Sequence, residues 1–228
     1  AQGLIENVAS GQSRLDYPLI DGVQKGCPHH ILEPARTNLI QYSEAFDNAY
    51  WVKTGSSITS NVAISPDGSL NADKLVEGTN NGGHNIQRVE NVSNATIYTS
   101  SVFVKYGGRE WIRFTDAQSS NRIHFNTLTG AFGAITGTVI DYNSIALSNG
   151  WYKLSITTTS VATAYALRVS LAEADNDVSY TGDGTSGVYI FGAMLEAGSY
   201  PTSYIPTNGT AVTRSAETAN GAGNSTTF

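Results

Sequence analysis

The stretch from Gly107 to Phe125, GGREWIRFTDAQSSNRIHF, gathers side chains suited to ligand chemistry. It places Trp111, Arg113, Arg122 and His124 on two segments that we expect to be β-strands. An indole ring can stack on the C–H face of a sugar, and a guanidinium group binds a carboxylate or a sulfate through paired hydrogen bonds. The chain has a net charge of −6, so this group of cations departs from its average. The residues predict a binding surface; the competing interpretation is a solvated sheet face.

Alternation along each strand separates core residues from outward-facing ones, because successive side chains point to opposite faces. With Ile112, Phe114, Ile123 and Phe125 in the core, the cations and the indole share the other face. The same reasoning on other strands completes the predicted carbohydrate-binding set, which is Gln87, Phe103, Lys105, Trp111, Arg113, Arg122, His124 and Arg168. We expect all eight on one concave sheet face. A one-residue error in register would turn a whole strand over.

The cations of this set indicate the charge of the ligand that would bind. Four of the chain's 13 lysine and arginine residues belong to it. An acidic protein with such a face favours an anionic glycan, such as a uronate or a sulfated polysaccharide. Neutral glycans also use arginine and glutamine, and a partner chain would cover the same face, so both alternatives stay open.

The turn pattern predicts an all-β protein. Segments such as IYTSSVFVKY, REWIRFTDA and AYALRVSLAEA are separated by Gly-, Asn- and Ser-rich turns. Short strands at regular spacing, without a sustained helical period, are typical of a β-sandwich or barrel. The chain has 19 acidic and 13 basic residues, and this acidic balance argues against nucleic-acid binding. No apolar run approaches the roughly 20 residues of a membrane span, and the lone Cys27 excludes an internal disulfide.

The order of several short motifs resembles the jelly-roll carbohydrate-binding modules attached to xylanases and glucanases. The motifs are Asn38-Leu39, Phe46 with Trp51, ADKLV at 72–76, YTSSVFVK at 98–105, GWYKL at 150–154, and the last strand before Glu-Ala-Gly at 196–198. The resemblance implies a galactose-binding-domain-like β-sandwich with antiparallel sheets that binds a polysaccharide without catalysis. In that family the last strand often carries paired aspartates, one of which helps to hold a structural calcium ion. Phe191 and Gly192 stand there in this chain, so calcium is left open and no other cofactor is implied.

A second resemblance links both ends of the chain to modules of bacteriophage fibre and tail proteins. It rests on ILEPARTNLI at 31–40, on SYPTSYIPT at 199–207, and on the pair Thr213-Arg214. It implies the same jelly roll in a virion or in a secreted bacterial protein, and it leaves the ligand open. We therefore expect an extracellular or virion-surface location, a neighbouring domain in a longer chain and, in a fibre, a homo-oligomer.

The predicted chain divides into three parts. We predict an N-terminal arm over residues 1–36, a jelly-roll module over 37–198, and an extended C-terminal strand with a linker over 199–228.

Three functions compete for this architecture. The preferred function is non-catalytic polysaccharide binding, and the first alternative is a structural or adhesion domain of a phage fibre. The second alternative is a polysaccharide lyase, with His124 as base and Arg113 and Gln87 neutralising a carboxylate. No glycosidase carboxylate pair lies on the predicted face.

Two clusters of metal-ligating residue types favour other roles. Cys27, His29 and His30 form a set without a fourth zinc ligand nearby, so a plain loop is expected. The segment ADNDVSYTGDGTSG supplies three aspartates but lacks the glycine and glutamate of an EF-hand loop. We expect its aspartates to cap turns.

Overall fold

The computed structural model describes residues 31–116, 118 and 120–217, and the backbone of four two-residue strands before them. These are β1 (Leu15–Asp16), β2 (Leu19–Ile20), β3 (Val23–Gln24) and β4 (His29–His30). β1 pairs with β4 and β2 pairs with β3, both antiparallel. The expectations for Cys27 and for the side chains of His29 and His30 lie outside the described residues.

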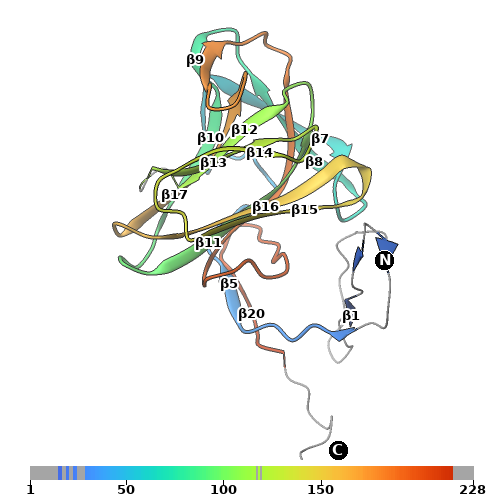
Figure 1. Ribbon diagram of the computed structural model, residues 1–228, viewed down its shortest axis with the longest axis vertical. Helices are drawn as coiled ribbons and strands as arrows, with labels where there is room; N and C mark the ends of the chain where they lie inside the picture. The colour runs from blue at the N-terminus through green and yellow to red at the C-terminus, as the bar shows by residue number, and fades with distance from the viewer. Residues whose placement is uncertain are drawn as a thin grey trace, which may run out of the picture.

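Two six-stranded antiparallel sheets make up the body of the protein (Figure 1). Sheet I, in spatial order, consists of β14 (Phe132–Thr136), β13 (Asn121–Asn126), β12 (Trp111–Asp116), β17 (Ala164–Ala172), β10 (Asn85–Asn91) and β6 (Val52–Thr54). Sheet II consists of β15 (Asp141–Ala146), β16 (Trp151–Thr159), β11 (Ile97–Tyr106), β19 (Gly187–Ala197), β8 (Leu70–Glu77) and β7 (Ser56–Ile64). The prediction of an all-β jelly-roll sandwich is confirmed.

Two further pairs of short strands and one 3-10 turn lie outside the two sheets. β9 (Asn81–Gly83) pairs with β18 (Ser179–Thr181), and β5 (Arg36–Asn38) pairs with β20 (Val212–Arg214). A 3-10 turn, η1 (Ser148–Gly150), precedes β16. Among the described residues, no helix has the length and apolarity that crossing a membrane requires.

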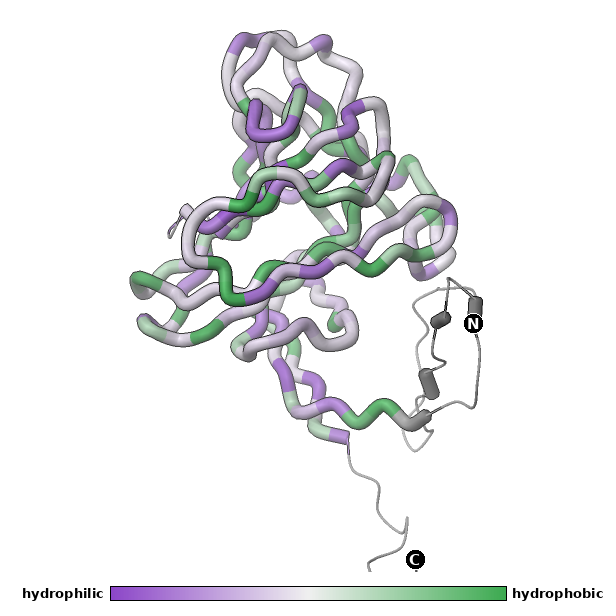
Figure 2. The backbone as a smooth tube through the Cα atoms, in the orientation of Figure 1, coloured by the Kyte–Doolittle hydropathy of each residue, from purple (hydrophilic) through white to green (hydrophobic). Residues whose placement is uncertain are grey.

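The core lies between the sheets, and the alternation of the strands produces it. Ile112, Phe114, Ile123 and Phe125 of sheet I are fully buried, and they share one cluster with Val102 of sheet II. Hydrophobic and hydrophilic residues follow one another along the strands in Figure 2. Every residue taken as core in the hairpin of β12 and β13 is therefore confirmed as core.

A second apolar cluster lies on the outer face of sheet II. Phe103, Trp151 and Phe191 are buried there, and Tyr204 packs against them from the segment that follows β19. Gly192 permits this packing, because a Cβ at its position would stand 2.8 Å from the Phe103 ring, and its φ is +60°. The chain after Gly198 thus covers part of sheet II, and in Figure 1 the β5–β20 pair lies on that side of the sandwich.

Candidate functional site

The outer face of sheet I carries six of the eight predicted binding residues in neighbouring cross-strand rows. One row runs Arg122–Thr115–Arg168–Gln87, and the next runs His124–Arg113–Ser170–Asn85. Trp111 lies in a third row, between Asn126 and Ala172. Neighbouring strands lie about 4.8 Å apart, so the rows bring three guanidinium groups within reach of one ligand. We call the set Gln87, Trp111, Arg113, Arg122, His124 and Arg168 the arginine face.

Phe103 and Lys105 do not belong to this face, which corrects the prediction of a single surface for all eight residues. Both lie on β11, which pairs with β16 and β19 in sheet II. Their outward direction follows from alternation, but it points to the opposite side of the sandwich. Phe103 is 3% exposed in the second apolar cluster, so it is a packing residue.

The three arginines of the face form no ion pair with any described residue. The other four described arginines each pair with a carboxylate, namely Arg36 with Glu196, Arg88 with Glu90, Arg109 with Glu77, and Arg214 with Glu33. Arg168 instead donates from Nε to Gln87 Oε1 at 2.7 Å. Burial, together with the charges of Arg122 and Arg168, lowers the pKa of Arg113. Cations gathered without counter-charge repel one another, and an external anion would relieve that repulsion.

Five buried polar atoms on the same face have no hydrogen-bond partner within the described part of the chain. They are Arg113 Nε, Thr115 Oγ1, Arg122 Nε, His124 Nε2 and Ser170 Oγ. Leaving such an atom without a partner costs about 1–3 kcal/mol, and folded proteins contain few of them. Their concentration on two adjacent rows identifies the arginine face as a place of unused hydrogen-bonding capacity.

A β-bulge fixes the orientation of the His124 ring. The pairing of β13 with β14 shifts register at His124, and this leaves the backbone of Ala134 free for side chains. The ring nitrogen Nδ1 lies 2.9 Å from Ala134 O, and Asp175 accepts a hydrogen bond from Ala134 N at 2.9 Å. Because Ala134 O can only accept, Nδ1 carries the hydrogen, and Nε2 of the neutral ring holds a lone pair.

The charges around His124 act in opposite directions. Burial lowers the pKa of His124, whereas the bond to Ala134 and the carboxylate of Asp175 raise it. Arg113 and Arg122 lower it further, so the net pKa lies below the usual value for histidine. The ring is therefore largely neutral at pH 7.

Trp111 differs from the two other tryptophans. Trp51 donates its indole N–H to Tyr42 O at 2.9 Å, Trp151 donates to Ile64 O at 3.1 Å, and both are 2% exposed. Trp111 is partly exposed, and its indole N–H has no partner among the described residues. Trp51 and Trp151 are therefore packing residues, the second of them in the apolar cluster outside sheet II, whereas the indole N–H of Trp111 is not used within the described part of the chain.

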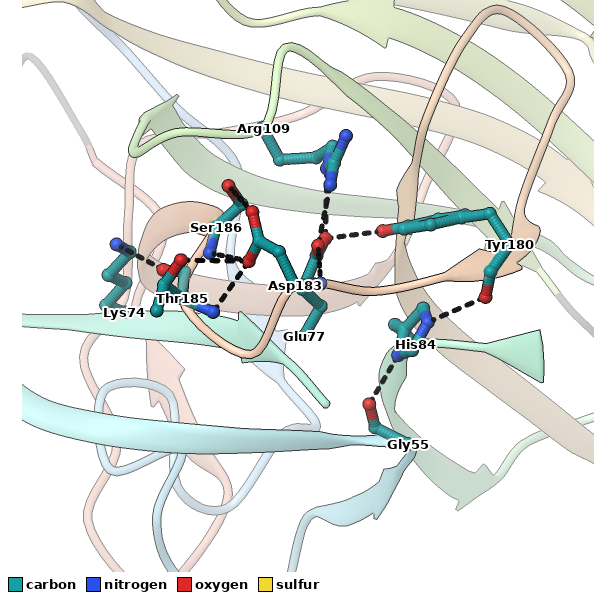
Figure 3. A network of polar contacts seen from close by, with 9 residues as sticks. All are labelled: Gly55, Lys74, Glu77, His84, Arg109, Tyr180, Asp183, Thr185 and Ser186. Atoms are coloured by element: carbon teal, nitrogen blue, oxygen red, sulfur yellow. Dashed lines mark hydrogen bonds and ion pairs between the residues drawn. The ribbon is translucent and has the colours of Figure 1, made fainter. Parts of the chain in front are cut away.

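A second polar cluster, at the end of the sandwich near β9 and β18, has the opposite character (Figure 3). The carboxylate of Glu77 is buried and accepts hydrogen bonds from Arg109 Nη2 at 2.6 Å, Tyr180 Oη at 2.7 Å and Asp183 N at 2.9 Å. The Arg109 guanidinium also lies over the Tyr180 ring at 4.9 Å. Every charge in this cluster is used internally, so it joins chain segments and leaves nothing for a ligand.

His84 and Asp183 add further hydrogen bonds to this polar cluster. The His84 ring is buried between Gly55 O, at 2.5 Å, and Tyr180 O, at 3.2 Å. Asp183 accepts hydrogen bonds from the Ser186 hydroxyl and from the backbone N–H groups of Ser186 and Thr185, and these bonds lower its pKa. The turn-capping role expected for Asp183 is confirmed.

No metal site emerges from the residues that the structure describes. They contain no group of three or more His, Cys, Asp or Glu side chains that could hold a metal ion. Asp175 and Asp177, which the sequence placed near a calcium-like loop, instead accept backbone hydrogen bonds from Ala134 and Ser179.

Sequence reasoning missed Thr115, Ser170 and Asp175. Thr115 and Ser170 have small side chains that give no signal by themselves, although alternation places both on the outward face. Asp175 lies in the turn after β17, and only the approach of that turn to β14 brings it to Ala134. The alternation of inward and outward side chains along β12 and β17 was the signal that would have added Thr115 and Ser170 to the predicted site.

A shallow pocket lies at a different place, near the paired strands β5 and β20. It is lined by Ala35, Arg36, Thr37, Leu39, Tyr98, Ala197 and Thr213. Its cation, Arg36, is already paired with Glu196 at 3.4 Å and lies over the Tyr200 ring at 5.3 Å. We favour the arginine face because its three arginines have no carboxylate partner among the described residues, and five of its buried polar atoms have no hydrogen-bond partner there.

No family model matches the sequence, and no curated protein matches it. Similar solved structures include the N-terminal modules of an endo-1,4-β-D-xylanase from Clostridium thermocellum complexed with xylohexaose, at 13% identity and a TM-score of 0.40, covering 75% of this chain and 30% of that one. The enzymatically active domain of a bacteriophage CBA120 tailspike protein matches at 14% identity and a TM-score of 0.42, covering 69% and 21%. A carbohydrate-binding module of a Cellvibrio mixtus lichenase, complexed with cellotriose, matches at 9% identity and a TM-score of 0.36, covering 71% and 96%.

Both classes that the sequence resembles are thus found among similar solved structures. This chain spans less than a third of the xylanase and tailspike chains. At these identities and TM-scores the likeness carries no argument about a ligand, which has to be derived from the residues of this chain.

Proposed function

We propose that this protein is a non-catalytic module that binds an acidic polysaccharide through the arginine face. The observation that carries the proposal is the group of Arg113, Arg122 and Arg168, which have no carboxylate partner among the described residues. Arginine binds carboxylate and sulfate groups in a planar, two-pronged geometry. A polymer that carries such groups would neutralise the repulsion on this face.

Each residue of the face contributes a separate contact to this proposal. The exposed ends of Arg113 and Arg122 bind acidic groups, and Arg168 does so while Gln87 holds its orientation. Trp111 supplies a ring for the C–H face of a sugar and an indole N–H for a hydroxyl. The cross-strand rows would let a polymer run across several strands, so that several weak contacts add along its length.

A pair of matched variants tests the function. Arg113→Gln removes a cation from the arginine face, and Lys105→Gln removes one from the opposite side of the sandwich. We expect affinity for polygalacturonate or dextran sulfate to fall about tenfold or more, equivalent to about 1.4 kcal/mol, in the first variant only. Affinity electrophoresis and calorimetry measure this. Equal losses in both variants, or no retardation of the wild type by any polysaccharide, would refute the proposal.

The dependence of binding on salt concentration gives a second test of the same proposal. Contacts between these partly exposed arginines and acidic groups weaken as ions screen them, over a Debye length of about 8 Å at physiological ionic strength. Binding of dextran sulfate should therefore weaken steeply with added salt. A neutral xylan measured in parallel should show little salt dependence if it binds at all, and preference for it would favour a neutral ligand.

Catalysis is not part of the proposal. A lyase needs a group that returns the proton to the leaving oxygen as well as a base. His124 has a free Nε2, but the two rows across β13, β12, β17 and β10 contain no tyrosine, lysine or carboxylate. Incubation with polygalacturonate should give no unsaturated-uronate absorbance, and its appearance would establish an enzyme instead.

The role in a phage fibre or adhesin is the alternative for the same face. In a fibre a neighbouring copy would cover the arginine face, and it would need acidic groups to match the arginines. The covering of sheet II by the chain after Gly198 leaves sheet I as the side for a large partner. Solution mass separates the cases, since a monomer that binds polysaccharide supports a secreted module and a stable oligomer that does not bind supports the fibre.

A further inference from the structure

His124 is the only histidine of the arginine face, and histidine is the side chain whose usual pKa lies closest to neutrality. Its ring is fully buried, and Nδ1 donates to Ala134 O, so protonation adds a hydrogen at Nε2. Nε2 has no hydrogen-bond partner among the described residues. A proton can therefore be added without breaking any bond that the ring already makes.

The charged groups that face His124 come from three elements. Arg113 lies directly opposite on β12, and Arg122 lies two residues away on β13. The carboxylate of Asp175, from the turn after β17, reaches the same Ala134 backbone that holds the ring. β14, the remaining neighbour, contributes only Ala134. The two cations disfavour a charged ring and the single carboxylate favours it.

An anion bound to these arginines changes this balance. It screens the repulsion that Arg113 and Arg122 exert on a protonated ring, and it adds an attraction of its own. Binding of the anion and binding of the proton then strengthen each other by the same factor, because the two equilibria are linked. We propose that His124 takes up a proton when an acidic polysaccharide binds the arginine face, so that the face binds more tightly as the pH falls.

This inference rests on the proposed function and adds a condition to it. A neutral glycan brings no charge to the arginines, so its affinity should not depend on the state of His124 in this way. The pH dependence is therefore also a criterion for the class of ligand. His124 acts on the ligand through charge, and no direct contact is required.

Dextran sulfate is the suitable probe, because its sulfate groups stay ionised over the whole range. We expect the affinity of the wild type to rise severalfold between pH 7.5 and pH 5.5. Calorimetry in two buffers of different ionisation enthalpy should detect the proton taken up, with a maximum of one per site. His124→Gln should remove both the uptake and the pH dependence.

A second variant and a direct measurement protect the test against misfolding. Asp175→Asn removes the carboxylate that favours the charged ring, so the rise in affinity should move to lower pH. An NMR titration of the wild-type His124 ring, assigned by comparison with His124→Gln, should show protonation at higher pH when dextran sulfate is present.

The outcomes separate this inference from the proposed function. Binding that is independent of pH, or a pH dependence retained in His124→Gln, would overturn the proton linkage and leave the binding face in place. Failure of any acidic polysaccharide to bind at pH 5.5 and at pH 7.5 would overturn both.

Discussion

The two outer faces of the sandwich contrast with each other. On sheet II, Phe103, Trp151 and Phe191 are buried beneath Tyr204. The polar groups nearby are also paired, since Lys153 donates to Thr202 O at 2.7 Å. On sheet I, the outward positions hold arginines without a carboxylate partner, and polar atoms without a hydrogen-bond partner, among the residues that the structure describes.

The difference separates residues that stabilise the fold from residues that we propose bind another molecule. Alternation directs both sets of side chains away from the core in the same way. On the covered side, Arg36 and Arg214 also have nitrogens without a hydrogen bond among the described residues, but both side chains are paired with carboxylates. The arginines of the other face are not. Repulsion and unmet hydrogen bonds cost stability, so their persistence on the other face is the expected mark of a binding surface, where function and stability compete.

The largest expected effect comes from the covered face. Phe103→Ala would leave a cavity among Trp151, Phe191 and Tyr204, and truncation of a buried phenylalanine costs about 3–5 kcal/mol. Urea unfolding measures the loss. A cost below about 1 kcal/mol would mean that the segment after Gly198 does not hold this cluster closed, and the contrast between the faces would disappear.

Trp111→Ala makes the complementary change on the open face. Binding of polysaccharide should weaken about tenfold or more, because the stacking ring and its free N–H are lost. The free energy of unfolding should fall by less than in Phe103→Ala, because Trp111 is partly exposed whereas Phe103 is 3% exposed. Electrophoretic retardation and urea unfolding of the same sample decide the matter, and normal binding by this variant would remove Trp111 from the site.

Arg113→Met on the arginine face should raise the stability of the protein. The methionine keeps part of the aliphatic stem and removes one of three mutually repelling cations. We expect a gain of about 0.5–1 kcal/mol in unfolding free energy together with the loss of acidic-polysaccharide binding. Arg109→Met is the control, and it should destabilise the protein because it leaves Glu77 buried without its cation. A loss of stability in Arg113→Met would show that the guanidinium has a structural partner.

The smallest effect concerns the free protein at mildly acid pH. Burial lowers the pKa of His124 in the folded chain, so the unfolded chain binds the proton first as the pH falls below about 6.5. Stability is therefore present above that pH and is lost as the pH falls toward the folded pKa. Urea unfolding at pH 7.5 and pH 5.5, without ligand, should show a larger loss for the wild type than for His124→Gln. Equal losses would place the titrating group elsewhere.

Several parts of this description were accessible from the sequence. The period-two pattern identified the core residues of β12 and β13, and the spacing of turns indicated an all-β sandwich. It also assigned Trp111, Arg113 and His124 correctly to an outward face. These statements depend on local geometry alone, which explains why they could be made without the structure.

Other parts depended on contacts between distant segments. The domain limits at residues 36 and 198 stay predictions, although Tyr204 and Thr202 beyond the second limit pack on sheet II. The bulge at His124 and the approach of Asp175 to Ala134 have no local signature. They arise where β13, β14 and the turn after β17 meet.

The sequence by itself determined which side chains of each strand point outward, because alternation is a property of the single strand. It did not determine which sheet a strand joins, and so it grouped Phe103 and Lys105 with the arginines. Only the tertiary structure decided that β11 pairs with β16 and β19, on the opposite side from β12 and β13. Strand pairing is set by the packing of segments far apart in the chain, so the composition of the arginine face is a tertiary property.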